Sequence, residues 1–156
     1  MSSYLALASR IRTSLIDIQN TVERADLLTK KALKTGDDGY WDGVALNLHG
    51  FYTGVEHIFE DIGRTMELSL PMGSEWHLDL LIQMSGEVEN IRPAVITRST
   101  RESLDAFRGF RHVVRNVYAL NLRPARLKEL MEGLNPCFES ITNDLNSFAS
   151  FLEKID

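Results

Sequence analysis

Residues 5–28 read LALASRIRTSLIDIQNTVERADLL, and this stretch decides the fold class. Its apolar residues recur at steps of three or four, at Leu5, Ala8, Ile11, Leu15, Ile18, Val22, Ala25 and Leu28. That spacing places them on one face of an amphipathic helix. Gly36 and Gly39 then supply a C-terminal cap and a turn. The sequence therefore predicts a long first helix that ends near Thr35.

The same spacing recurs through the rest of the chain, and only 10 Gly and 4 Pro interrupt it. A second helix is predicted from about residue 41 to 66, and a third from the N-cap Ser74 to about 86. Ser99 and Glu102 have capping-box spacing and open a fourth helix that runs to about 120. A short helix over 124–132 and a last one over 135–154, opened by Asn135 and Pro136, complete the chain. We predict one all-α domain over residues 1–156, an antiparallel bundle of about five helices.

The charge and the cysteine content of the chain limit the kinds of ligand, metal site and cellular compartment that we expect. The 156 residues carry 17 Lys and Arg against 22 Asp and Glu, a formal net charge of −5, so contact with nucleic acid requires a local basic patch. The single cysteine, Cys137, excludes an internal disulfide framework and a cysteine-based zinc site, and it fits a reducing cytoplasm. Neither a secretion signal nor a membrane-spanning segment is indicated, so we expect a cytoplasmic protein. No P-loop, GxGxxG, GxSxG or HExxH pattern occurs.

The segment from Arg98 to Arg126 departs from this acidic balance. It holds seven arginines and two acids, a local charge of +5, so the rest of the chain sums to −10. Guanidinium groups gathered on one element are what local phosphate recognition requires. The alternative is a solvent-exposed helix face on which the arginines form salt bridges, and this is the more common explanation of a basic helix.

Placed at 100° per residue, the fourth helix has a core face that includes Phe107 and Phe110. An adjoining polar arc carries Arg108, Arg111, His112, Arg115 and Asn116, with Tyr118 at its border. Guanidinium holds phosphate, imidazole moves protons near neutral pH, and phenol forms hydrogen bonds or is modified. All these groups project from one helix. A cleft for RNA therefore needs a second wall, most simply the same helix of a second protomer across a two-fold axis.

Two stretches resemble a known family. Residues 110–118, FRHVVRNVY, resemble the signature of HEPN proteins of the HepT type, in which an Arg is followed by four residues, a His, one residue and a Tyr. Residues 45–59, ALNLHGFYTGVEHIF, followed by Pro71 and by WHLDLL at 76–81, resemble the HepT-like subfamily. Together the stretches cover most of residues 40–122.

The resemblance implies an α-helical homodimer and a metal-independent, cofactor-free RNase toxin, encoded beside a minimal nucleotidyltransferase antitoxin. Arg111 would then bind the scissile phosphate, with Arg108 and Arg115 as further RNA contacts. Tyr118 would be the phenol to which some antitoxins of the family transfer AMP. The chain departs from the family at one decisive position, because Asn116 stands where the motif has His.

Asn116 can hydrogen-bond a phosphate oxygen or a 2′-OH, but it cannot take or deliver a proton at pH 7. His112, one turn earlier, is the alternative proton carrier of the same helix, or else a merely polar neighbour. Two functions follow from these alternatives. One is an endoribonuclease whose catalytic residues are Arg111, Asn116 and His112; the other is a non-catalytic adaptor that binds the nucleotidyltransferase or presents Tyr118 to it.

The other histidine, acidic, aromatic and cysteine residues are interpreted mainly as structural or surface residues. His49 with His57, and Glu56 with Glu60, have helical spacing, but without a matched pair from another helix we expect no metal site. We interpret these four side chains as hydrogen-bonded surface or interface groups. We expect Phe51 and Phe59 in the core, Tyr52 as a weaker candidate for the cleft, and Trp76 and His77 as a cover for the end of the bundle. Cys137, placed in the first turn of the last predicted helix, is interpreted as structural although a helix dipole there would lower its thiol pKa.

Overall fold

The computed structural model describes residues 3–117 and 123–155, and the side chains of these residues except 112–117. The elements in chain order are α1 (Ser3–Thr35), α2 (Gly39–Ile62), a π-helical turn η1 (Gly63–Glu67), α3 (Trp76–Met84), α4 (Arg98–Val117) and α5 (Pro124–Lys154). The described part of the chain contains no strand, only an isolated bridge between Val88 and Arg92. The prediction of an all-α fold with five main helices is confirmed.

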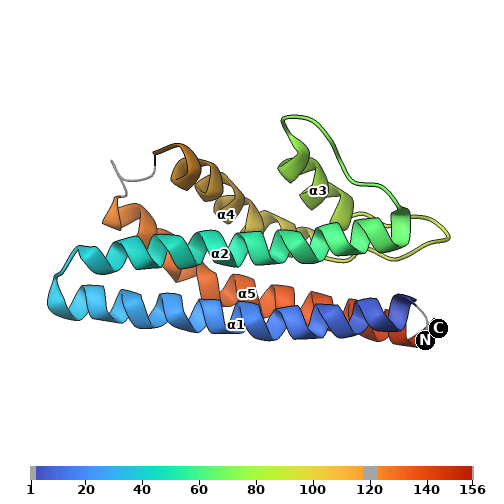
Figure 1. The fold of residues 1–156 in the computed structure, drawn as a ribbon, viewed down its shortest axis with the longest axis horizontal. Coiled ribbons are helices and arrows are strands. Elements are labelled where there is room, and N and C mark those ends of the chain that lie inside the picture. Colours follow the sequence, from blue (N-terminus) through green and yellow to red (C-terminus); the bar gives the residue numbers. More distant parts are fainter. Residues whose placement is uncertain (1–2, 118–122, 156) are drawn as a thin grey trace.

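Helix α1 lies along both α2 and α5, and α4 packs over α2 and α5 with α3 beside it (Figure 1). The beginning of α1 meets the end of α5, where Arg12 Nη2 lies 2.7 Å from Glu153 Oε1. The predicted stripe of α1 is buried from Ala8 to Leu28, whereas Leu5 is exposed and Leu7 is buried in its place. None of the described helices is long and apolar enough to cross a membrane.

The end of α2 differs in detail from the prediction, because its last turn is π-helical. The N–H of Leu68 bonds the carbonyl of Gly63, and Leu68 itself takes a left-handed backbone with φ 53°. Gly63 has no side chain, so the returning residues Ser69 and Leu70 pack directly against its backbone. An added Cβ there would lie 2.7 Å from Leu70 and 3.1 Å from the Ser69 carbonyl. The turn thus reverses the chain toward α3.

Two predicted helix starts are wrong by one or two residues. Ser74 is not the N-cap of α3, whose cap position is occupied by Glu75. Ser99 lies inside α4, and the capping residue is Thr97, whose Oγ1 accepts the N–H of Thr100 at 3.2 Å. Threonine provides the same capping oxygen as serine, so the pattern alone did not separate the two positions.

The predicted break before the last helix is also wrong, because α5 runs without interruption through Pro136. Proline inside a helix removes one hydrogen bond and costs about 3 kcal/mol. Here a continuous apolar stripe offsets that cost, and its buried members on both sides of the proline are Leu127, Leu130, Met131, Leu134, Cys137, Ile141, Leu145, Phe148, Ala149 and Leu152. Cys137 is therefore buried in mid-helix rather than near an N-terminus. Burial raises its pKa to about 11, opposite to the predicted direction.

A buried ion pair fixes the connection between α3 and α4. Arg92, whose side chain is completely buried, lies 2.6 Å from Glu67 at the end of η1. Its guanidinium also donates to the backbone carbonyls of Gln83, Gly86 and Pro93. This cluster anchors the segment that delivers the chain into α4.

Candidate active site

Arg111 lies where three helices meet. Its Nη1 atom is 2.8 Å from Nε2 of His77, and its Nε atom is 3.6 Å from Oε1 of Glu56. Glu56 comes from α2, His77 from the first turn of α3, and Arg111 from α4. The Arg111 side chain is 17% exposed, so it is covered on most sides and still reaches solvent. A cation, an imidazole and a carboxylate are therefore gathered from parts of the chain that are far apart in sequence.

His77 is held through both ring nitrogens. Its Nδ1 atom lies 2.5 Å from Oε2 of Glu56, and its Nε2 atom faces Arg111. The Trp76 ring lies against the imidazole, with ring centroids 3.6 Å apart. The His77 side chain remains 19% exposed. The imidazole is thus fixed in orientation but accessible at one edge.

Glu56 is the buried member of the cluster, with a side chain only 3% exposed. It lies beside Val55 and Phe59 on the buried face of α2, which brings a carboxylate into the core. Burial raises the pKa of Glu56 above its ordinary value, although the neighbouring His77 and Arg111 act to lower this pKa. Such a buried carboxylate depends on its partners, because an unpaired charge at this position is strongly unfavourable.

Tyr52 lies one turn before Glu56 and is also buried. Its hydroxyl has no hydrogen-bond partner among the described residues. Burial raises the pKa of Tyr52, and the charge of Glu56 raises it further, so the phenol stays neutral. The nearby charges of Arg108 and Arg111 act in the opposite direction. Tyr52, the weaker candidate for the cleft, is therefore an interior neighbour of the cluster.

Among the described arginines of the basic segment, several are paired within the chain. Arg108 contacts Asp105 at 2.8 Å, Arg98 contacts Glu102 at 3.2 Å, and Arg126 contacts Glu129 at 3.3 Å. Arg101 donates to the hydroxyl of Ser85. Salt bridges along the face thus coexist with the cluster at Arg111. The other predicted site residues, His112, Arg115, Asn116 and Tyr118, lie outside the described side chains.

The two partners of Arg111 were not predicted from the sequence. His77 was expected to cover the end of the bundle, and Glu56 was expected to be a hydrogen-bonded surface or interface group, whereas its side chain is buried. One signal was present in the sequence, since both residues fall within the stretches at 45–59 and 76–81. No group of three or more His, Cys, Asp and Glu side chains suited to a metal occurs among the described residues.

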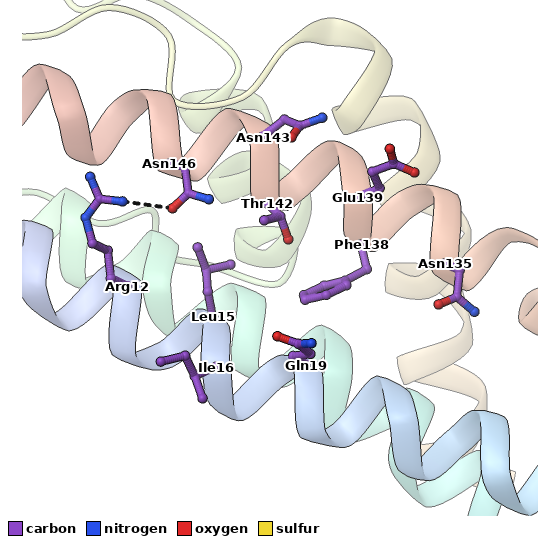
Figure 2. A pocket seen from close by; sticks show the side chains of 10 residues that line it. All are labelled: Arg12, Leu15, Ile16, Gln19, Asn135, Phe138, Glu139, Thr142, Asn143 and Asn146. Carbon is purple, nitrogen blue, oxygen red and sulfur yellow. Dashed lines mark hydrogen bonds between the residues drawn. The ribbon is translucent and has the colours of Figure 1, made fainter.

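A groove of about 620 Å³ lies elsewhere, between α1 and α5 (Figure 2). Amide side chains line it from both helices, Asn135, Asn143 and Asn146 from α5 and Gln19 from α1, and Arg12 at one end donates to Asn146 at 3.0 Å. Phe138 and Leu15 supply apolar surface within it. None of the residues predicted for the site lines this groove, so the chemistry gathered around Arg111 is separate from it.

Comparison with known proteins gives one family. A family model described as HepT-like protein matches residues 43–152. The matched region contains α3, α4 and nearly all of α2 and α5, and with them all three members of the cluster around Arg111. No curated protein and no solved structure matches the chain.

Proposed function

Because the chain belongs to the HepT-like family of HEPN proteins, we propose that it is the toxin of a toxin–antitoxin pair and cleaves RNA without a metal ion. The observation that carries the proposal is the 2.8 Å contact between Arg111 and His77 beside a buried carboxylate. A phosphate-binding cation and a proton-transferring group are the two components that metal-free cleavage of RNA requires.

In the proposed reaction the 2′-OH of the RNA attacks the adjacent phosphate. Arg111 stabilises the negative charge that develops on the phosphoryl oxygens, and its planar fork suits two of them at once. Arg108 and Arg115 extend the contact along the RNA backbone, and His112 and Asn116 orient the reacting groups. Two protomers bring their copies of α4 together, so the cleft is shared across the dimer.

The ion pair between Arg111 and Glu56 opposes the binding of a phosphate to Arg111 in this reaction. Their 3.6 Å contact partly neutralises the guanidinium in the resting protein. A phosphate must therefore compete with a buried carboxylate for Arg111. In this proposal the end of the Arg111 side chain, which is 17% exposed, turns toward solvent to bind the incoming phosphate.

The test is an RNase assay in the presence of EDTA on the purified wild type and on Arg111→Ala, His112→Ala and Asn116→His. Wild-type cleavage that disappears in Arg111→Ala supports the proposal. Arg98→Ala is the matched control, since Arg98 lies on the same helix in an exposed pair with Glu102. If only Asn116→His cuts RNA, the natural chain binds RNA without cutting it, and the proposed activity is wrong.

A second candidate function is favoured by Asn116 and by the pairing of Arg111 with Glu56. Here the chain is a non-catalytic adaptor that binds a minimal nucleotidyltransferase or receives AMP on Tyr118. Mass spectrometry after co-expression with a neighbouring nucleotidyltransferase tests this function, with Tyr118→Phe as the control. A Tyr118 peptide that stays unmodified while the partner is active rules out the modification.

A further inference from the structure

We propose that His77 is the general base of the site, oriented by Glu56 and held inactive by Arg111 until a phosphate binds. The inference rests on the proposed RNase function and assigns the proton transfer that Asn116 cannot perform. It begins from the position of His77 between an acceptor and a donor, 2.5 Å from the Glu56 carboxylate and 2.8 Å from the Arg111 guanidinium.

The hydrogen-bond partners determine which nitrogen carries the proton. A guanidinium has only N–H donors, so Nε2 of His77 must accept from Arg111 through its lone pair. The proton of the neutral ring then lies on Nδ1, which donates to the Glu56 carboxylate. The basic nitrogen of His77 therefore points at the residue that binds phosphate.

The pairing with Glu56 has a second consequence. A carboxylate on one ring nitrogen fixes the tautomer and orientation of the imidazole and stabilises the imidazolium that forms when the other nitrogen takes a proton. Glu56 is 3% exposed, so water screens this stabilisation little. The charged groups that the structure places against His77 are Glu56 from α2 and Arg111 from α4.

Phosphate binding links the two roles. When Arg111 turns to the phosphate, its N–H leaves Nε2, and the lone pair of His77 becomes free beside the bound nucleotide. His77 then takes the proton of the 2′-OH while O2′ forms its bond to phosphorus. The bond from phosphorus to the 5′-oxygen breaks, water gives the leaving oxygen a proton, and the imidazolium returns its own to the hydroxide. The products are a 2′,3′-cyclic phosphate and a 5′-OH, with no net proton released.

His77→Gln is the decisive variant, because an amide can still accept from Arg111 and donate to Glu56 but cannot transfer a proton. We expect a loss of about 10²–10⁴-fold in cleavage rate with unchanged thermal unfolding. The acidic limb of the pH–rate profile should disappear from the residual activity. His77→Ala should regain part of its rate in added imidazole, which a merely structural role would not allow. His57→Gln, an exposed histidine on α2, is the control.

A measurement on the wild type covers the case in which the variants fail to fold. Nitrogen NMR of His77 should show the proton on Nδ1, and a 2′-deoxy oligonucleotide, which binds but lacks the nucleophile, should shift the Nε2 resonance. A proton on Nε2 overturns the inference. Equal cleavage rates of wild type and His77→Gln overturn the assignment of His77 as the base but leave the RNase function standing. The same conclusion follows if His77→Ala cleaves slowly and added imidazole does not restore its rate. A wild type that cuts no faster than Arg111→Ala overturns the function itself.

Discussion

Arg111 Nε and Glu56 Oε1 lie 3.6 Å apart, so the cation of the candidate site is paired with a carboxylate that is almost completely buried. The same carboxylate contacts His77 through its other oxygen. Glu56 is therefore the shared anchor of both groups. Its removal should change RNA binding and proton transfer in opposite directions, because it competes with phosphate for Arg111 and supports the imidazolium of His77.

Glu56→Gln is expected to bind RNA more tightly and to cleave it more slowly. Without the competing charge, the affinity for a 2′-deoxy oligonucleotide should rise by up to about tenfold, which corresponds to about 1.4 kcal/mol. Without the carboxylate that stabilises the imidazolium, the cleavage rate should fall by about 10²-fold or more. Fluorescence anisotropy at fixed salt and single-turnover cleavage measure the two effects. Glu132→Gln, at an exposed position of α5, should change neither. Weaker binding by Glu56→Gln would contradict the competition.

The raised pKa of Glu56 also predicts how stability depends on pH. Its ordinary value is 4.5, and burial raises it in the folded protein, so the folded state binds this proton more readily than the unfolded state. The contribution of Glu56 is therefore most favourable below pH 4.5 and is lost as pH rises through the folded pKa. As the pH rises from 4.5 to the folded pKa of Glu56, the free energy of unfolding of Glu56→Gln should increase relative to that of wild type by at most about 1.4 kcal/mol per pH unit. Urea unfolding at several pH values measures the difference, and a difference that stays constant with pH would refute the assignment.

The helices were predictable because their apolar stripes are long. α1 ends at Thr35 as predicted, since eight regularly spaced apolar residues and a following glycine leave few alternatives. The capping residues were not predictable to the residue, because Thr97 and Ser99 offer the same chemistry. The site was predictable only in part. Periodicity placed Arg111 on the polar side of α4, but the partners from α2 and α3 depend on how helices pack, which no pattern within one helix contains.

Arg92 tests how much the buried ion pair with Glu67 contributes to the fold. Arg92→Ala should lower the free energy of unfolding by about 3–5 kcal/mol, because it removes the countercharge of the buried Glu67, which keeps only its hydrogen bond from Gln83, and the donor of three backbone carbonyls. The double variant Arg92→Met with Glu67→Met should recover only part of this loss, since it removes both charges together but leaves the three carbonyls without a donor. Arg126→Ala, which breaks an exposed pair with Glu129, should cost less than about 1 kcal/mol. Chemical denaturation measures all three variants, and equal losses for Arg92 and Arg126 would show that burial adds nothing.

Pro136 explains why the last helix was wrongly divided, and it yields the remaining prediction. Asn135 and Pro136 resemble a helix start, yet Asn135 instead donates to Asp26 of α1 at 3.0 Å, and Pro136 lies on the exposed side of a continuous helix. Pro136→Ala should restore the missing backbone hydrogen bond, worth about 3 kcal/mol with the relief of the ring clash. It also gives back about 1 kcal/mol of entropy to the unfolded chain, so the expected net gain is about 2 kcal/mol.

Pro124→Ala is the matched control for that gain. Pro124 occupies the first turn of the same helix, where its lack of an N–H removes no hydrogen bond and its fixed φ favours the helix. Its replacement should therefore leave stability unchanged or lower it by up to about 1 kcal/mol. Urea unfolding of the two variants beside the wild type separates the effects. If Pro136→Ala is no more stable than Pro124→Ala, the helix already accommodates Pro136 without strain. The proline then has no free-energy cost that burial of the apolar stripe must offset.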